Sequence, residues 1–324
     1  MSKNITIIGA GQLGSRHLQA LALVKDSICI QVVDTSQEAL AIAESRFNEV
    51  SATFSGKISF HTSIAALEKE QEIVIVATGS KIRRSIIEEL LAHAKVKNLI
   101  LEKFLFVKEE DYSFVEQLLN EKQVATWVNC PRRMMSLYRT LQQELTGKIH
   151  FVVNGNAWGL GCNGIHLLDL FSFLTNERSI QLSNDLIDKQ IIESKRPGYI
   201  EFTGTITGHA NGHSFHMTSF SEGASPLQLI IHTATAKYSI QEGATAKVWI
   251  SKQANQWAWE EHSFTMPFQS QLTNIVVDDI LATGNCTLTT YKESAHLHIL
   301  FLNNLLAHLR KVNNDNTLKE CLIT

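Results

Sequence analysis

Short apolar runs alternate with amphipathic segments up to about residue 125. The runs have the length and composition of buried parallel strands: Ile5–Ile8, Ile28–Val33, Ile73–Ala77, Leu99–Leu101 and Val124–Val128. Between them, apolar residues at helical spacing predict helices over Gln12–Val24, Ser36–Phe47 and Lys81–Lys95. This alternation predicts an α/β fold with a doubly wound parallel sheet of the Rossmann type.

The pattern changes at Cys130-Pro131. Pro131 suits the first turn of a helix, and Gly147 suits its end, so a helix is expected between them. From about residue 148, alternating positions predict an open, mostly antiparallel sheet. Its strands are expected over 200–207, Leu227–Thr233, Lys237–Gln241, Ala246–Ser251 and Gln256–Glu261, with late helices over Gln269–Ala282 and Tyr291–Leu309. We therefore expect a Rossmann domain over residues 1–129 and an α+β domain over residues 130–324.

Charge and composition exclude several classes of binding partner. The 324 residues contain 29 Lys and Arg against 32 Asp and Glu, so no basic excess exists to bind a nucleic-acid backbone. The sequence has no basic amphipathic stretch and no run of about 18 apolar residues. We therefore expect neither binding to a membrane surface nor a transmembrane helix. The five cysteines are scattered and odd in number, and the N-terminus does not read as a signal peptide. These features predict reduced thiols and a cytoplasmic location.

The most specific motif is Gly9-Ala10-Gly11-Gln12-Leu13-Gly14, between the first strand and the first helix. Gly9 permits the tight turn, Gly11 admits a pyrophosphate, and Gly14 allows close packing of helix on strand. Gln12 and Leu13 begin the helix, whose N-terminal N–H groups would bind the phosphates. Asp34, 20 residues after Gly14, would accept from the ribose 2′-hydroxyl and repel a 2′-phosphate. The expected cofactor is NAD.

Two further strands end in polar residues at the same edge of the sheet. Thr78 and Ser80 are candidate cofactor contacts, although Ser80 is equally suited to cap a helix. Glu102 and Lys103 follow the next strand, and an ammonium group there can bond a substrate hydroxyl and transfer its proton. Both residues are counted as cofactor-binding candidates, and Lys103 also as a catalytic candidate.

A second group of chemistry-bearing residues follows Gly159. His166 and Asp169 lie three residues apart and would share a helix face. An imidazole is a natural general base for an alcohol, and Asp169 could orient it. The alternative is a structural histidine in the helix core.

Taken together, the motifs make the chain similar to the Gfo/Idh/MocA oxidoreductase family. The residues that match are Gly9–Gly14 with His17, Glu102-Lys103, Arg132-Arg133 and Gly164-Ile165-His166 through Asp169. The resemblance implies NAD(P)-dependent oxidation or reduction of sugars, polyols or nucleotide sugars. It also implies that Lys103 is the catalytic lysine, His166 the active-site histidine and Asp169 a supporting acid. Pairing through the open face of the C-terminal sheet, as a homodimer or homotetramer, is a further implication.

The chain departs from the family at two positions. Phe104 replaces the usual proline after Glu-Lys, and Cys162 replaces the aspartate four residues before the histidine. Arg132, Asn156, Trp158 and Asn163 are the candidate substrate-binding residues, and the resemblance points weakly to bacterial surface-sugar pathways.

Other functions remain open at this stage. The ligand types in Cys162, His166 and Asp169, and in the group His209, His213 and His216, lack the number and geometry of a metal site, so no metal is expected. The leading hypothesis is an NAD-dependent oxidoreductase. Its alternatives are an NAD-binding sensor or regulator without catalytic activity and an NAD-dependent glycosidase.

Overall fold

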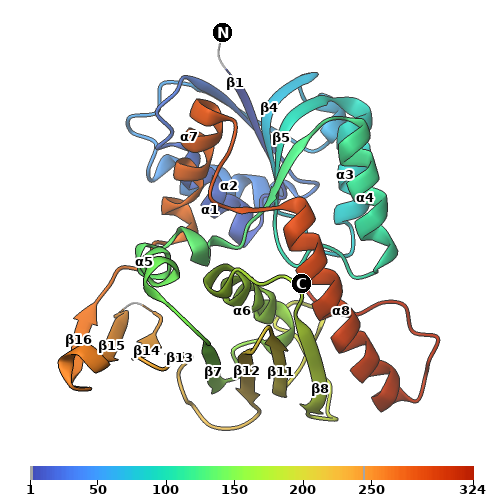
Figure 1. Cartoon of the computed structure of the whole chain (residues 1–324). Helices are drawn as coiled ribbons and strands as arrows, with labels where there is room; N and C mark the ends of the chain where they lie inside the picture. Colours follow the sequence, from blue (N-terminus) through green and yellow to red (C-terminus); the bar gives the residue numbers. More distant parts are fainter. Residues whose placement is uncertain (1–2, 244) are drawn as a thin grey trace. The chain divides into compact units, whose positions relative to one another are not determined.

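The computed structural model describes residues 3–243 and 245–324 (Figure 1). Met1 and Ser2 of the expected first domain and Ala244 of the second lie outside the described residues. The chain divides into two compact units. Unit 1 comprises Met1–Phe106, Glu110–Pro131 and Pro267–Ala295, and unit 2 comprises Val107–Glu109, Arg132–Met266 and His296–Thr324.

Unit 1 is built on a seven-stranded sheet in the order β17-β6-β5-β4-β1-β2-β3. The strands are β1 (Lys3–Ile8), β2 (Ile28–Val33), β3 (Lys57–His61), β4 (Glu70–Val76), β5 (Lys95–Leu101), β6 (Ala125–Val128) and β17 (Thr289–Thr290). All neighbours pair in parallel except β17, which is antiparallel to β6. The order of the six parallel strands is that of dinucleotide-binding Rossmann folds.

Helices cover the unit 1 sheet because its central strands are apolar on both faces. They are α1 (Gln12–Leu21), α2 (Gln37–Asn48), α3 (Arg83–His93), α4 (Glu110–Glu121) and α7 (Thr273–Thr283). α1 packs against α2 and α7, whereas α3 packs against α4 (Figure 1). Central side chains such as Ile5, Ile7, Ile73 and Leu99 are fully buried, as a doubly wound sheet requires.

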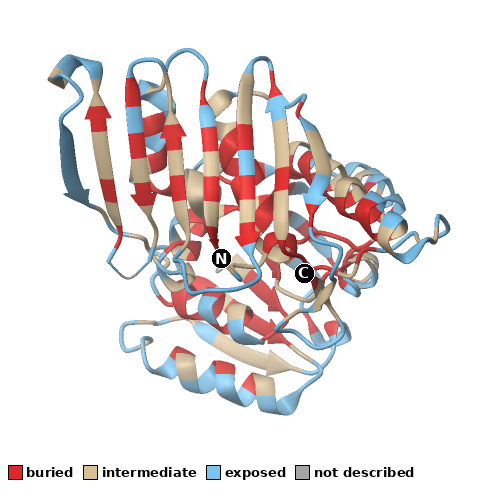
Figure 2. Ribbon diagram, turned by 90° about the horizontal axis from the view of Figure 1, so that it is seen from below, coloured by how far each residue is buried: buried red, intermediate tan, exposed pale blue. Residues whose placement is uncertain are grey.

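Unit 2 contains an eight-stranded sheet in the order β16-β15-β14-β13-β7-β12-β11-β8. Its strands are β7 (His150–Asn156), β8 (Gln181–Ile187), β11 (Gly204–Ala210), β12 (His213–Phe220), β13 (Gln228–His232), β14 (Ala236–Gln241), β15 (Lys247–Lys252) and β16 (Trp259–Ser263). Only β7 and β12 pair in parallel. Buried residues alternate with less buried ones along most of these strands, so one face of the sheet belongs to a core and the other remains open (Figure 2).

The helices of unit 2 supply the other half of its core. They are α5 (Ser136–Glu144), α6 (Leu160–Thr175) and the larger part of α8 (Tyr291–Asn313), and a short ribbon pairs β9 (Ile192–Glu193) with β10 (Ile200–Glu201). α6 is the central helix. Its Ile165, Leu168 and Phe171 are fully buried, and α6 packs against β12, β10 and α5.

The fold confirms the expected α/β class, with a Rossmann sheet followed by a mostly antiparallel one. The observed units differ from the single expected boundary after residue 129. Cys130 and Pro131 belong to unit 1, and Val107–Glu109 belongs to unit 2. Pro267–Ala295 groups with unit 1, because α7 packs on α1 and β17 extends the sheet beside β6.

Several element boundaries also differ from expectation. Met135 is extended (φ −71°, ψ 135°), so the helix expected from Pro131 is divided into a 3₁₀ turn, Pro131–Met134, and α5. Trp257 has a left-handed φ of 63°, so β16 begins only at Trp259. The sequence pattern did not predict the helix α4 or the strands β3, β7, β8 and β12.

Candidate functional site

The glycine turn between β1 and α1 has the geometry that its sequence predicts. Gly9 adopts φ +96°, and its N–H donates to the carbonyl of Val33 at 2.8 Å. A Cβ on Gly14 would lie 1.7 Å from the carbonyl oxygen of Gly9, so only glycine permits this approach of helix to turn. A Cβ on Gly11 would meet nothing within 4 Å, which leaves open space where a pyrophosphate would lie.

A pocket of about 400 Å³ opens beside this turn at the carboxyl ends of the strands. Its lining includes four of the predicted cofactor-binding residues, Gly9, Gly11, Asp34 and Thr78. The hydroxyl of Thr78 is buried and has no hydrogen-bond partner within the described part of the chain, so a ligand in the pocket could supply one. The position matches the crevice in which open α/β sheets bind nucleotides.

Asp34 lines the pocket where the ribose of a bound dinucleotide is expected. Its Oδ2 accepts from the N–H of Ala10 at 2.7 Å, and its Oδ1 accepts from the N–H of Ser36 at 2.9 Å. Each carboxylate oxygen can accept a second hydrogen bond, so the ribose hydroxyls can still bind there. The backbone bonds fix the orientation of the carboxylate before a ligand arrives.

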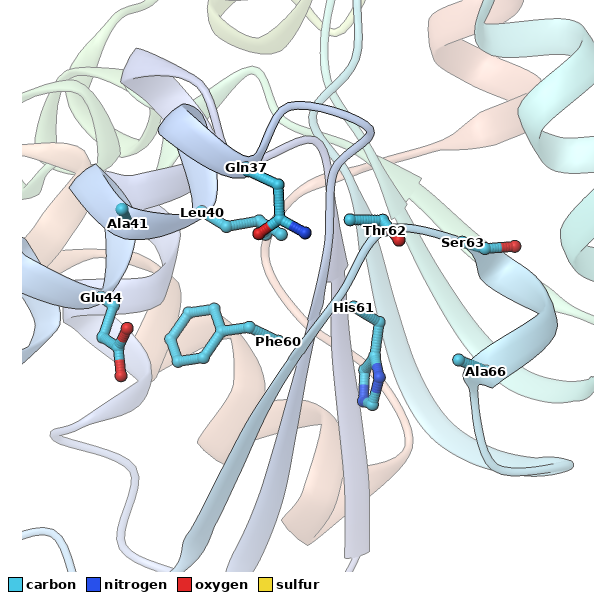
Figure 3. A pocket seen from close by; sticks show the side chains of 9 residues that line it. All are labelled: Gln37, Leu40, Ala41, Glu44, Phe60, His61, Thr62, Ser63 and Ala66. Carbon is cyan, nitrogen blue, oxygen red and sulfur yellow. The ribbon is translucent and has the colours of Figure 1, made fainter.

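A second pocket of about 360 Å³ shares the lining residues Thr62 and Ser63 with the first one. Figure 3 shows the side chains that line the second pocket. α2 lines one side with Gln37 and Glu44, and the other side is lined by His61 at the end of β3 and by Ser63 just after it. Neither pocket has a Lys or Arg among its lining residues, all of which belong to the described part of unit 1. A 2′-phosphate on the ribose would therefore meet carboxylates and no guanidinium or ammonium group.

The start of α1 suits the phosphates of a dinucleotide. In this helix, which the structure describes completely, the first turn holds no acidic residue, and the N-cap Gly11 offers no side chain. Gln12 and Leu13 occupy that turn, and Arg46 of α2 holds the Gln12 side chain through a 2.9 Å bond to its Oε1. The N-terminal N–H groups and the positive end of the helix dipole remain available to an anion.

Lys103 is half-buried and follows the carboxyl end of β5. The Lys103–Phe104 peptide bond is cis. The buried guanidinium of Arg83 donates to the carbonyls of Phe104 and Leu105, and also to the carbonyl of Thr78 in the pocket wall. Arg83 therefore joins the segment after Lys103 to the wall of the nucleotide pocket, within unit 1.

Glu102 points into the interior of unit 1 and does not line the pocket. It is 3% exposed, and its Oε1 lies 2.9 Å from Nε2 of His17 and accepts from Nδ2 of Asn129. Burial alone would raise the pKa of Glu102, but the bonds from His17 and Asn129 hold the pKa below its usual value. Glu102 is thus a buried anion next to Lys103 in the sequence. Ser80, another of the predicted cofactor-binding residues, is also buried, with 1% of its surface exposed.

In unit 2, the N-cap residue of α6 is Gly159, which adopts a left-handed φ of 85°. The carboxylate of Glu201, from β10, accepts from the N–H groups of Gly161 and Cys162 and so caps the helix. Cys162 occupies the first turn, and His166 lies half-buried one turn later. Glu201 thus provides a carboxylate at the helix start from a different element of unit 2.

Asp169 is 1% exposed and engaged by Arg133. Nε and Nη2 of Arg133 donate to the two carboxylate oxygens at 3.0 and 2.8 Å. This arrangement anchors α6 to the segment before α5. The role of Asp169 in orienting His166 therefore remains a prediction, and the observed contact favours a structural role.

Arg132 is likewise committed to an ion pair. Its Nε and Nη2 donate to Glu242 at 3.0 and 2.6 Å, and the hydroxyl of Tyr138 donates to Glu242 at 2.6 Å. A substrate carboxylate or phosphate would have to compete with Glu242 for this guanidinium.

The other predicted substrate residues hold the loop between β7 and α6. Asn156 donates to the carbonyl of Phe220 at 3.0 Å, Trp158 donates to the carbonyl of Thr218 at 2.8 Å, and Asn163 donates to the carbonyl of Trp158 at 2.7 Å. Their side chains thus shape the loop itself, and substrate contact remains a prediction.

Within residues 3–243 and 245–324, no group of three or more His, Cys, Asp or Glu is arranged to hold a metal ion. The same described residues contain no helix that combines the length and apolarity needed to cross a bilayer.

Sequence reasoning missed several residues that build the site. Thr62, Ser63 and Ile64 line the nucleotide pocket, and the alternation in Lys57–His61 could have revealed the strand that leads to them. Arg83, Glu201 and Glu242 had no local signal, because their partners lie far away in the sequence.

The glycine turn, the pocket and the strand order define unit 1 as a dinucleotide-binding Rossmann domain. Residues 3–130 match the GFO_IDH_MocA family model, described as an oxidoreductase family with an NAD-binding Rossmann fold. Over residues 3–130, this match confirms the resemblance to the Gfo/Idh/MocA oxidoreductase family and the expected NAD cofactor. No curated protein sequence matches the chain.

Solved structures share the fold over most of the chain. An oxidoreductase from Agrobacterium radiobacter, in complex with NAD⁺, L-tartaric acid and magnesium, is 16% identical with a TM-score of 0.72, covering 96% of this chain and 97% of its own. UDP-N-acetylglucosamine 3-dehydrogenase from Acidithiobacillus ferrooxidans is 14% identical with a TM-score of 0.70, covering 94% and 97%. The transcriptional regulator Gal80p from Kluyveromyces lactis is 12% identical with a TM-score of 0.70, covering 96% and 90%. At these identities the likeness shows the fold alone.

Proposed function

We propose that the chain is an NAD(H)-dependent oxidoreductase that transfers a hydride to or from a sugar, polyol or nucleotide-sugar derivative. The observation that supports this most directly is the connection made by Arg83 in unit 1. One guanidinium binds both the Thr78 wall of the nucleotide pocket and the carbonyls directly after Lys103. An amine that can transfer protons is thereby fixed to the frame of an NAD pocket.

The chemistry divides between the cofactor and the protein. Bound NAD supplies the hydride acceptor, and NADH supplies the donor in the reverse direction. The side chain of Lys103 would bond the substrate hydroxyl oxygen and exchange its proton as the carbonyl forms. His166 is the second proposed acid–base group, assigned by the family resemblance and by its half-buried position on α6.

The sugar-type substrate is part of the proposal. Oxidation of a sugar hydroxyl removes a hydride from the carbon and a proton from the attached oxygen. Lys103 and His166 offer an amine and an imidazole that can accept this proton. The dehydrogenase structure from Acidithiobacillus ferrooxidans, named for UDP-N-acetylglucosamine, is a precedent on the same fold. A role in bacterial surface-sugar biosynthesis would agree with such a substrate. A cytoplasmic location is also proposed, since the five cysteines are odd in number and scattered along the sequence, which does not suggest a disulfide framework.

The test is turnover with a panel of sugars, polyols and nucleotide sugars, followed by nicotinamide absorbance. Lys103→Ala and His166→Ala should each lower kcat by about a hundredfold or more, with NAD affinity retained in calorimetry. Unchanged turnover in both variants would refute the assignment. A glycoside cleaved with no net absorbance change would replace hydride transfer by NAD-dependent glycosidase activity.

A non-catalytic NAD-binding regulator is the second candidate. Phe104 and Cys162 depart from the family pattern beside Lys103 and before His166, and a transcriptional regulator shares the fold. NADH binding without turnover on the whole panel would favour this candidate over the enzyme.

A further inference from the structure

A closed ring of hydrogen bonds lies in the interior of unit 1, beneath Lys103. Its members are His17, Glu102, Asn129, Gln269 and Thr273, and the first three and Thr273 are each at most 3% exposed. They come from α1, from the ends of β5 and β6, and from the segment that begins α7. Four separate parts of the unit therefore meet in one polar cluster.

The hydrogen bonds run from Asn129, which donates to both of its neighbours, towards Glu102, which accepts from both sides. Nδ2 of Asn129 donates to Oε1 of Glu102 and, at 2.9 Å, to Oε1 of Gln269. Nε2 of Gln269 donates at 2.9 Å to Oγ1 of Thr273, which lies 2.8 Å from Nδ1 of His17.

Closure of the ring follows from the chemistry of the imidazole. The Thr273 hydroxyl has two possible acceptors, Nδ1 of His17 at 2.8 Å and the backbone carbonyl of Gln269 at 3.2 Å. When it donates to Nδ1, Nε2 of His17 carries the proton and donates to Glu102 across 2.9 Å. In this arrangement the two amides, the hydroxyl and the imidazole each donate to a neighbour in the ring, and the Glu102 carboxylate accepts from both sides.

The ring also anchors the segments by which the chain leaves and re-enters unit 1. Glu102 lies just before the exit at Phe106, Asn129 just before the exit at Pro131, and Gln269 just after the return at Pro267. On the other side of Lys103, Arg83 holds the carbonyls of Phe104 and Leu105. Lys103 is thus the half-buried residue between two anchored neighbours.

A buried carboxylate is an unfavourable way to join strands to a helix, since the ion must be desolvated. An apolar contact would hold the same elements together without a charge. A buried anion adjacent to an amine, in contrast, acts on the position and the proton affinity of that amine. The low pKa of Glu102, held down against burial by His17 and Asn129, keeps this charge in place.

We propose that this ring is a positioning device for Lys103, in which His17 and Thr273 act through Glu102 and couple the dinucleotide-binding helix α1 to the amine. The inference rests on the proposed function, because it gives the ring its purpose. His17 and Glu102 are positioning residues, and Lys103 is the group that would touch the substrate.

The test measures the reactivity of Lys103 and needs no substrate. The full chain is labelled with acetic anhydride over a range of pH, and acetylation of each lysine is followed by mass spectrometry. In Glu102→Gln the anion is removed, so the midpoint of Lys103 acetylation should move to lower pH, and labelling at pH 7.5 should rise about threefold or more. Thr273→Val breaks the ring far from Lys103 and should also alter its labelling.

Thr6→Val is the matched control. Thr6 is fully buried in β1 of the same unit and donates to Gln71 at 2.7 Å, outside the ring. Both valine variants should lower the unfolding midpoint, but only Thr273→Val should change Lys103. If Lys103 labels identically in wild type, Glu102→Gln and Thr273→Val, the proposal is overturned and the ring is structural only.

The failure of this proposal can be told apart from failure of the proposed function. Altered labelling in the ring variants, together with full turnover in Lys103→Ala, would leave the positioning effect standing and remove Lys103 from catalysis. Once a substrate is found, Thr273→Val should lower kcat and leave the KM for NAD unchanged. A loss confined to KM would count against positioning.

Discussion

Arg133 donates two parallel hydrogen bonds, of 3.0 and 2.8 Å, to the carboxylate of Asp169. The side chain of Asp169 is 1% exposed and that of Arg133 is 13% exposed. The guanidinium also lies over the ring of Phe173, 5.2 Å from its centroid. A planar, bidentate pair of this kind fixes both partners in orientation as well as distance. It ties α6, the helix of His166, to the chain just before α5.

Replacing one member of this pair should destabilise unit 2. Arg133→Met keeps most of the side-chain volume but leaves the Asp169 charge buried without its partner, which costs about 3 kcal/mol or more. Urea unfolding followed by far-UV circular dichroism measures the loss. Arg139→Met, an exposed arginine on α5, is the matched control and should change stability little. The double variant Arg133→Met/Asp169→Leu should recover much of the loss, because no buried charge remains. An unaltered midpoint in Arg133→Met would contradict the prediction.

The lowered pKa of Glu242 should make the stability of the fold depend on pH in the acid range. Burial alone would raise the pKa of Glu242, but the ion pair with Arg132 and the bond from Tyr138 hold it below the ordinary value of 4.5. A carboxyl group whose pKa is lower in the folded state stabilises the fold above the unfolded pKa and loses that contribution as pH falls through the folded pKa. The stabilisation is therefore complete above about pH 4.5 and declines below it.

Glu242→Gln should flatten the dependence of unfolding free energy on pH below 4.5 and lower stability at neutral pH, since Arg132 loses its anion. The measurement is a series of urea melts from pH 3 to pH 7. Glu222→Gln, an exposed carboxylate, serves as the control and should leave the slope unchanged. A steep acid slope retained in Glu242→Gln would show that other groups dominate.

The parts of the site that could be predicted from the sequence were those with a local signal. The glycine turn, Asp34 and Lys103 each sit next to an apolar run whose end fixes their edge of the sheet, so the pattern placed them on the correct edge. Glu102 could be placed at that edge as well, but the alternation of a strand end did not reveal that it turns inward to His17.

Long-range partners could not be predicted in the same way. Arg132 and Arg133 are adjacent in sequence, yet one pairs with Glu242 and the other with Asp169. Such choices depend on which elements the fold brings together, and no spacing rule encodes them. The segment 267–295 returns to unit 1 for the same reason: its place is set by packing against α1 and pairing with β6.

Asp34 should determine the preference for NAD over NADP. Its carboxylate is held toward the pocket by Ala10 and Ser36, and the adjoining pocket offers no Lys or Arg among its lining residues. Asp34→Ser removes the repulsion of a 2′-phosphate and a charge-assisted bond to ribose, so NADH affinity should fall about tenfold and NADPH affinity should rise. Fluorescence titration with both coenzymes provides the measurement. Glu49→Gln, at the far end of α2, is the control. Equal affinity ratios in wild type and Asp34→Ser would contradict the role of Asp34.

The open face of the unit 2 sheet should mediate self-association as a homodimer or homotetramer. Ile230 and Val152 are directly opposed near the middle of this face, and their neighbours Leu229, Ile231 and Val153 point to the buried side with no exposure. Phe220 and Trp259 on the surrounding strands are 47% and 55% exposed, an unusual cost for a monomer. Ile230→Glu places a charge in the centre of the expected interface and should shift sedimentation at micromolar concentration towards the monomer. Phe268→Glu, which changes a 72% exposed aromatic of unit 1, is the matched control and should leave the assembly intact. A monomeric wild type would show that no such interface exists. An assembly that persists in Ile230→Glu but is lost in Phe268→Glu would show that the interface lies elsewhere.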